Sequence, residues 1–569
     1  MPVYSLPVIG SLYEAHPTIA AILVSIPVLV ALVILYLYPY SEYTLSFRNL
    51  PGPKPASFFW GNIKQLMAAR PGLLHAEWVA QYGSTMRYRL LLGNNRLFSS
   101  DPVFLGYVLQ HADDFPKPER TSKALARMLG NGLLSAEDVV HRRQRKIINP
   151  AFSPQAIRDV TPIFWDKAYE LKGKLMGFVE RDENLISEMP SPTPPAAGDE
   201  DKGGRKIDVM KYLGQMALDI IGLAGFGYDF QALSHTHNEL ADNFSAMFSA
   251  STRITPLAIL QNFLPFFSFI PSKNKSIIKK SHAATMRVAQ DLVERKKRAI
   301  AAEYTGALEK GSDIGKDLLS ILIKANMAPD LRPDQKMTDA EVMAQITTFI
   351  LAGNETSSTA LTWILYRLGL NPDVQKRLRE EVQSVSSDTP STEELNALTY
   401  LDKVVHESLR LDGPVPGTMR KAKVDAVIPL GTPVVGRDGT LVDSVPVKKG
   451  MEIFIPITNV NKSKDIWGDD AEAFNPDRFD RNGLPARHVP GTWGNLLSFL
   501  GGARNCIGYR FALVEIKITL FVLIRAFSFE ELASKPDVEP KSSIVMRPRI
   551  VGEEAAGLQM PLLVRALDE

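Results

Sequence analysis

One stretch of the chain constrains the fold more than any other, because it reads as a single long and buried helix. Residues 338–341, Thr-Asp-Ala-Glu, form a capping box, in which the first and fourth side chains satisfy free backbone groups at a helix start. The helical pattern continues to Leu368 and stops at Gly369, which corresponds to about 45 Å of helix. Apolar residues occupy nearly every side of it, so we expect the helix to run through the middle of a large fold.

The centre of this helix is polar, although the rest is apolar. Residues 353–356 read Gly-Asn-Glu-Thr. Buried polar groups cost free energy unless they find partners. Two interpretations remain open at this point. One is a helix kink stabilised by Ser and Thr side chains that bond to the preceding turn, and the other is a functional site.

The N-terminal region predicts a membrane anchor. Residues 18–38 carry no charge and are long enough to span a bilayer core of roughly 30 Å. A cleaved signal peptide is the alternative, but the apolar run is longer than usual for one and no basic segment precedes it. Basic residues follow the run and do not precede it, which places the body of the chain in the cytosol. We therefore expect a lumenal segment at residues 1–17.

The remaining organisation is simple. Prolines are dense in residues 39–56, which predicts a stiff linker between the anchor and a body spanning 57–569. Residues 187–204 are rich in Pro, Gly and acidic side chains, which is typical of a disordered insertion. A hairpin is expected within 429–447, around a Gly-Arg-Asp-Gly tip.

The 65 basic and 63 acidic residues nearly balance, so a nucleic-acid partner is not indicated.

Cys506 is the only cysteine among 569 residues, which excludes an intramolecular disulfide and a cysteine-based zinc cluster. Gly502 and Gly508 flank it and would let backbone N–H groups approach the sulfur. A helix predicted to start near Ile507 points its positive end at the sulfur, and Arg504 adds a cation. These features favour a thiolate that acts as a metal ligand or nucleophile, whereas the alternative is a buried spectator thiol.

A pair of charged residues lies in another, largely apolar helix. Glu407 and Arg410 are spaced i, i+3 and so share a helix face. Taken alone, they read most simply as a surface ion pair. Arg478 is a possible third member of a buried network.

Together these segments resemble one protein family. The pattern Phe499-x-x-Gly502-x-Arg504-x-Cys506-x-Gly508 is similar to the haem-ligand loop of the cytochromes P450. Residues 352–357, the Glu407–Arg410 pair and residues 476–479 resemble three further motifs of that family, in the expected order. The likeness extends from about Leu50 to the C-terminus. The anchor and linker resemble the eukaryotic microsomal branch, and the insertion resembles fungal members.

The resemblance implies roles for individual residues. Cys506 would be the axial thiolate of haem b, in a loop shaped by Phe499, Gly502 and Gly508. The haem propionates would be bound by Arg504, His141, Arg145 and Arg420, with His141 replacing the tryptophan that the family usually has. Thr356 and Glu355 would deliver protons during oxygen activation. Glu407, Arg410 and Arg478 would be structural, and residues 120–134 and 414–419 would border the substrate pocket.

The sequence thus predicts a mainly α fold with small β-sheets, the cytochrome P450 fold behind a transmembrane helix. The expected function is a haem-thiolate monooxygenase in the endoplasmic reticulum membrane, with a cytosolic catalytic domain. It would use O2 and an NADPH-dependent flavoprotein reductase, with cytochrome b5 as an optional donor, to oxidise a lipophilic small molecule such as a terpenoid, sterol, fatty acid or aromatic. Two alternatives are a haem-thiolate isomerase or dehydratase acting on peroxides, and a non-enzymatic membrane haem-binding protein.

Overall fold

The computed structural model describes most of the chain. The described ranges are 17–180, 204–234, 269–304, 317–327, 332–542 and 544–567, together with isolated residues between 243 and 261. The predicted lumenal segment 1–17 and the predicted insertion 187–204 fall almost wholly outside these ranges. The statements below concern the described residues.

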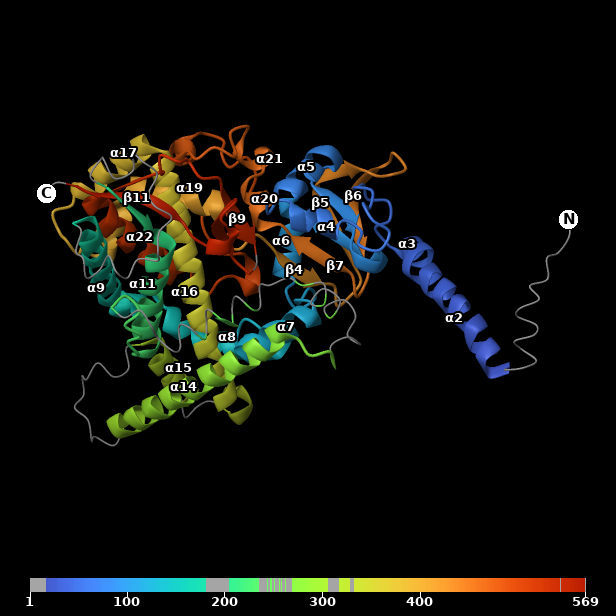
Figure 1. The fold of residues 1–569 in the computed structure, drawn as a ribbon, viewed down its shortest axis with the longest axis horizontal. Coiled ribbons are helices and arrows are strands. Elements are labelled where there is room, and N and C mark those ends of the chain that lie inside the picture. The colour runs from blue at the N-terminus through green and yellow to red at the C-terminus, as the bar shows by residue number, and fades with distance from the viewer. Residues whose placement is uncertain are drawn as a thin grey trace.

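The long helix expected from the sequence is the central element of the helical part. Helix α16 spans Asp339–Leu370, and Thr338 caps it with Glu341 in the predicted capping box. The helix ends two residues later than predicted. Gly369 lies within its last turn, and the chain leaves the helix at Asn371, before Pro372. Figure 1 shows α16 crossing the helical region between its neighbours. It packs against α11 (Val209–Phe226), α14 (Lys273–Tyr304), α19 (Thr399–Asp412) and α22 (Tyr509–Ala526).

Further helices complete this region. Helix α9 (Pro154–Val179) packs against α22 and α11, and a continuous apolar core connects them. The other longer helices are α5 (Leu73–Tyr82), α6 (Pro102–Gln110), α7 (Glu119–Leu129), α8 (Asp138–Ile148), α15 (Leu318–Met327) and α17 (Pro372–Gln383). Short helices are α4 (Ile63–Ala68), α18 (Thr392–Ala397), α20 (Ile457–Asn461) and α21 (Lys464–Trp467).

The strands form small sheets beside and within the helical region (Figure 1). One sheet has the order β1 (Thr85–Arg89), β2 (Asn95–Ser99), β7 (Glu452–Ile455) and β4 (Thr418–Lys421), with β2 and β7 parallel. The predicted hairpin is confirmed as β5 (Ala426–Val435) and β6 (Leu441–Val447). The rest are β3 (Arg205–Asp208), β11 (Pro561–Ala566) and β8 (Phe527–Glu530) in one sheet, and β9 (Val538–Ser542) with β10 (Met546–Ile550). The predicted class, mainly α with small sheets, is confirmed.

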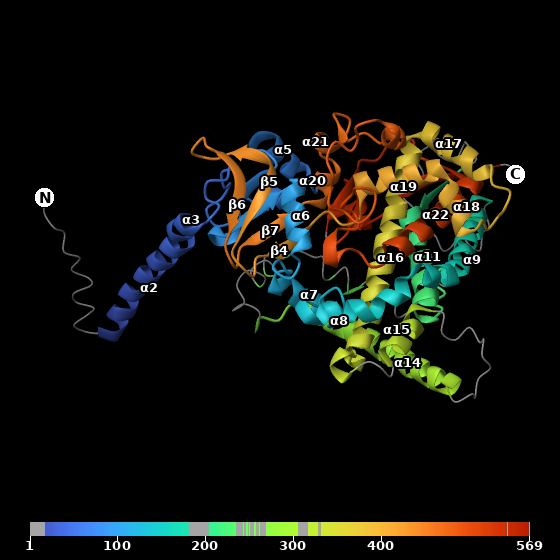
Figure 2. The ribbon, with the colours of Figure 1, turned by 180° about the vertical axis from the view of Figure 1, so that it is seen from behind.

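The N-terminal helix projects away from the body, as both views show (Figures 1 and 2). Helix α2 (Pro17–Leu35) continues through a π-helical turn (Tyr36–Tyr40) into α3 (Ser41–Thr44). Ser25–Thr44 is apolar and long enough to cross a membrane. This helix is therefore compatible with membrane anchoring.

The C-terminal end of this helical segment packs on the body. The Tyr38 hydroxyl donates to the carbonyl of Phe58 at 2.7 Å, and Glu42 forms ion pairs with Arg87 and Arg89. Phe47 and Leu50, within the predicted linker, are each 2% exposed and belong to the main core. The end of the N-terminal helix is thus held against the sheet that contains β1.

Candidate active site

A cavity of about 340 Å³ lies where the loop before α22 faces the middle of α16. Its walls are predominantly apolar. They include Leu133, Leu134, Ile221, Phe349, Val415, Phe511 and Ile516. Leu133 and Leu134 come from the predicted roof segment 120–134, most of which is helix α7, and Val415 comes from 414–419. An enclosure of this kind suits a bulky apolar molecule better than a strongly polar one.

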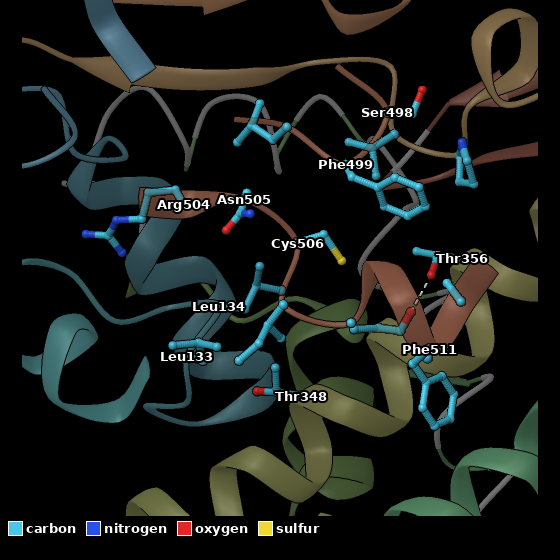
Figure 3. A pocket seen from close by; sticks show the side chains of 18 of the residues that line it. Leu133, Leu134, Thr348, Thr356, Ser498, Phe499, Arg504, Asn505, Cys506 and Phe511 are labelled. Atoms are coloured by element: carbon cyan, nitrogen blue, oxygen red, sulfur yellow. Dashed lines mark hydrogen bonds between the residues drawn. The ribbon is translucent and has the colours of Figure 1, made fainter. Parts of the chain in front are cut away.

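The loop that carries Cys506 has a specific backbone shape (Figure 3). The Cys506 N–H donates to the carbonyl of Phe499 at 2.8 Å, which closes the loop. Gly502 has φ of +68°, and a Cβ there would lie 2.1 Å from the carbonyl oxygen of Leu109, so only glycine fits. The loop does not require glycine at position 508 in the same way. The φ of Gly508 is −91°, and an added Cβ would lie 3.4 Å from its nearest neighbour, the Phe152 ring, which is an ordinary contact distance.

Cys506 is accessible from the cavity, although protein atoms enclose it on its other sides. Burial raises the pKa of its thiol, while the N–H of Gly508, the N-cap of α22, and the charge of Arg145 act in the opposite direction. The cation that acts on the sulfur is therefore Arg145, where the sequence suggested Arg504. The reason is that Arg504 points away from Cys506 (Figure 3) and donates to Glu137 and to the carbonyl of Ala136.

Basic side chains converge on one side of the cavity around a single carboxylate. Glu137 forms ion pairs with Lys117 and Arg504, each at 2.5 Å. Arg420 is 3% exposed and donates to the hydroxyl of Thr418 and the carbonyl of Met419. Burial lowers the pKa of Arg420 to about 10 and that of Lys117 to about 8, and Glu137 only partly offsets this. This wall of the cavity therefore carries an excess of positive charge.

His141 and Arg145 lie one turn apart on α8 and both border the cavity. Burial, followed by the charge of Arg504 and other nearby cations, lowers the pKa of His141 to about 3, so the imidazole is neutral at neutral pH. Arg145 donates to the backbone carbonyl and to the side-chain oxygen of Asn505, each at 2.7 Å. Arg145 thus holds the residue next to Cys506.

The polar centre of α16 divides between two environments. Thr356 lines the cavity, and its hydroxyl donates to the carbonyl of Ala352 at 2.5 Å (Figure 3). Glu355 is absent from the cavity lining and forms an ion pair with Arg547 of β10. Gly353 also borders the cavity, and a Cβ there would lie 2.9 Å from the side chain of Ile221. The glycine thus lets α11 approach α16 closely.

The structure brings Glu407, Arg410 and Arg478 together in the core. Both Arg410 and Glu407 are fully buried, and the guanidinium donates to the two carboxylate oxygens at 2.7 and 2.8 Å. Arg478 donates to Glu407 at 3.3 Å. Arg410 also donates to the carbonyl of Asn461, whose side chain bonds to Ser498 next to Phe499. The network therefore supports the start of the cysteine loop.

Sequence reasoning missed three residues of this site. Lys117 stands between two prolines, a local pattern that gives no indication of a cavity. Glu137 directly precedes α8, and only the fold places it between Lys117 and Arg504. Arg547 is far along the chain from Glu355, so only the tertiary structure pairs them.

Comparisons with known proteins agree with this architecture. The family model for cytochrome P450 matches residues 50–551. Cytochrome P450 monooxygenase 205 of Postia placenta is 42% identical over 525 residues, covering 92% of this chain and 93% of the relative. Cytochrome P450 monooxygenase 128 of the same fungus is 40% identical, with the same coverage. Cytochrome P450 monooxygenase claQ of Ampulloclitocybe clavipes is 34% identical, covering 91% of this chain and 93% of that protein.

A mainly helical fold with a cysteine loop facing an apolar cavity is the architecture of a haem-thiolate protein. With the family model covering most of its length, the chain belongs to the cytochrome P450 family. Its fungal relatives are monooxygenases, and the chain is accordingly an oxidoreductase. The family binds haem b through a cysteine thiolate.

The residues at the cavity fit haem b. The chain has one cysteine, and its sulfur is accessible from the cavity. Haem b also carries two propionates, which need cationic partners. Among the described carboxylates, Glu137 is the one that forms ion pairs with Lys117 and Arg504, and it also acts on the buried Arg420. One carboxylate between three cations leaves positive charge at this wall for an anionic ligand.

Proposed function

We propose that this protein is a membrane-anchored haem-thiolate monooxygenase that hydroxylates or epoxidises a lipophilic small molecule in fungal secondary metabolism. One oxygen atom of O2 would enter a C–H or C=C bond, and the other would leave as water. The observation that carries the proposal is the accessibility of the Cys506 sulfur from an apolar cavity that Thr356 also lines. The fungal monooxygenases at 40–42% identity support the same class of reaction.

Cys506 is the proposed axial ligand of the haem. A thiolate ligand supplies electron density that favours cleavage of the O–O bond. The Gly508 N–H and Arg145 favour negative charge on the sulfur, although burial outweighs them and raises the pKa of the free thiol. Coordination to the haem iron would supply the remaining stabilisation of the thiolate. Arg420, Arg504, Arg145 and neutral His141 are the proposed partners of the propionates, and the structure adds Lys117 to the candidates.

Thr356 and Glu355 are the proposed proton-handling pair on α16. The Thr356 hydroxyl can hold or pass a proton at the cavity surface. Glu355 can take part only when its ion pair with Arg547 opens, because that contact holds the carboxylate outside the cavity lining. The substrate would occupy the space beside Thr356, against Leu134, Phe349 and Val415. These walls exclude water from the reacting groups.

The proposed location is the endoplasmic reticulum membrane, with the catalytic domain in the cytosol. Support comes from the apolar helix over Ser25–Thr44 and from the basic residues that follow it. Electrons would come from an NADPH-dependent flavoprotein reductase, with cytochrome b5 as an optional second donor. The sequence contains no Gly-x-Gly-x-x-Gly unit of its own for a nicotinamide or flavin domain.

The carbon monoxide difference spectrum of reduced membranes tests the proposal. Wild-type protein should give the red-shifted Soret band of thiolate-ligated haem, and Cys506→Ser should lose it. A folded wild-type protein without that band would reject haem-thiolate chemistry. Product formation should further require NADPH and the reductase, and turnover without them would favour an isomerase or dehydratase.

A further inference from the structure

A pair of buried amides connects the roof segment of the cavity to two helices. Gln345 of α16 and Gln144 of α8 are both fully buried, and the Gln345 side chain donates to the side-chain oxygen of Gln144 at 3.2 Å. Neither glutamine lines the cavity. A buried amide costs free energy unless its donors and acceptors find partners, so its partners are held in place by it.

Both glutamines bind the backbone of the roof segment. The side-chain oxygen of Gln345 accepts the N–H of Leu133 at 2.9 Å, and its nitrogen also donates to the carbonyl of Glu341, one turn earlier on α16, at 3.1 Å. The Gln144 nitrogen donates to the carbonyl of Asn131 at 2.9 Å. The two amides therefore hold the roof segment at two positions that are two residues apart.

The roof segment also packs directly against α16. An added Cβ at Gly132 would lie 2.5 Å from the hydroxyl oxygen of Thr348 and 2.7 Å from the carbonyl oxygen of Ala344, so the two backbones are as close as a glycine allows. The Thr347 hydroxyl donates to the carbonyl of Leu129. The roof segment is thus fastened to α16 before the amide bridge as well as at it.

Two leucines of the fastened segment form part of the cavity wall. Leu133 and Leu134 line the cavity, and Figure 3 shows them between the Cys506 loop and Thr348 of α16. Directly after the segment, the carbonyl of Ala136 accepts a hydrogen bond from Arg504 at 2.9 Å. The protein's own hydrogen bonds therefore set the shape of this wall.

We propose that Gln345 determines substrate specificity by position. Together with Gln144 it holds residues 131–134 as a fixed wall, so that molecules are selected by how well they fit against Leu133 and Leu134. Without the bridge, the wall would yield to bulkier molecules and discriminate less between sizes. Gln345 is a positioning residue, because it acts through Leu133 and does not border the cavity. The inference rests on the proposed function.

Hydrogen exchange of the haem-loaded full chain tests whether the bridge holds the wall. Gln345→Met keeps the length of the side chain but leaves the Leu133 N–H without its acceptor, so exchange there should quicken about tenfold or more. Gln375→Met is the matched control, because Gln375 is 3% exposed, accepts the N–H of Phe529 at 2.9 Å and lies outside the cavity lining. It should quicken exchange at Phe529 and leave Leu133 unchanged.

Two haem-iron ligands of different size test the specificity itself. Imidazole and clotrimazole, a much bulkier triaryl-substituted imidazole, both bind iron through a ring nitrogen, and the Soret shift gives each Kd. In Gln345→Met, the Kd of clotrimazole divided by that of imidazole should fall about fivefold or more, because the released wall yields to the bulky ligand. Gln375→Met should keep the wild-type ratio, and a general structural defect would weaken both ligands alike.

Two results would overturn the proposal. One is equal exchange at Leu133 in wild type and Gln345→Met, and the other is an unchanged ratio of the two Kd values. If Gln345→Met does not fold, Gln144→Met removes the bridge from the side of α8, and the same fall in the ratio is expected, with an unchanged ratio counting against the proposal. The carbon monoxide spectrum reports thiolate ligation separately, so failure of the proposed function and failure of this inference are distinguishable.

Discussion

Arg145 on α8 donates to both the backbone carbonyl and the side-chain oxygen of Asn505, each at 2.7 Å. Asn505 directly precedes Cys506, and it also donates to Thr492 at 2.8 Å. One guanidinium therefore holds the cysteine loop in position and adds positive charge beside the sulfur. This contact couples the geometry of the proposed ligand to its electrostatics.

Arg145→Ala should reduce haem occupancy. Hydrogen bonds to charged groups contribute about 1.5–3 kcal/mol each, so the loop should become less ordered and haem binding should weaken by about tenfold or more. Haem content per folded protein, from the carbon monoxide spectrum, measures this. Arg158→Ala is the control, because among the described residues the Arg158 side chain bonds only to Gln155, one turn away on an exposed part of α9. Equal haem content in both variants would contradict this role.

Gly502→Ala should disrupt the cysteine loop. The added Cβ would meet the Leu109 carbonyl at 2.1 Å in a left-handed conformation, so the backbone must move. Loss of the thiolate band from folded protein is the expected result. Gly439→Ala shares the positive φ, at +83°, but its Cβ would meet nothing. A normal band in Gly439→Ala together with a lost band in Gly502→Ala would assign the effect to the clash.

Glu407→Ala should strongly destabilise the fold. Breaking this buried ion pair leaves Arg410 without a carboxylate partner and Arg478 with Asp470 alone, which costs about 3–5 kcal/mol. Thermal unfolding should show a large fall in Tm. Asp477→Ala removes the exposed ion pair with Arg377 and should cost about 1 kcal/mol or less. Similar Tm values for the two variants would show that the network is not structural.

Thr356→Ala should retain haem but divert electrons from NADPH to hydrogen peroxide, because a hydroxyl at the cavity surface is lost. The fraction of NADPH recovered as peroxide measures this in a reductase-coupled assay. Thr362→Ala is the control, since Thr362 also bonds back along α16 but lies outside the cavity lining. Unchanged peroxide release in Thr356→Ala would remove Thr356 from proton handling.

Local sequence patterns predicted a substantial part of the architecture. The capping box at Thr338, the hairpin around Gly436 and the i, i+3 pair Glu407 and Arg410 all occur in the structure. Each pattern depends on residues a few positions apart, whose geometry follows from helix and turn rules alone. The cysteine loop is also local, and its glycine at position 502 is required by its own backbone conformation.

The sequence by itself determined the class of fold, the position of Cys506 at the start of a helix and the presence of an apolar N-terminal helix. Only the tertiary structure decided which charges meet. It paired Glu355 with Arg547 and placed Arg145, not Arg504, beside the sulfur. The physical reason is that ion pairing and burial depend on distances in space, and residues far apart in the chain acquire these distances only when the helices pack.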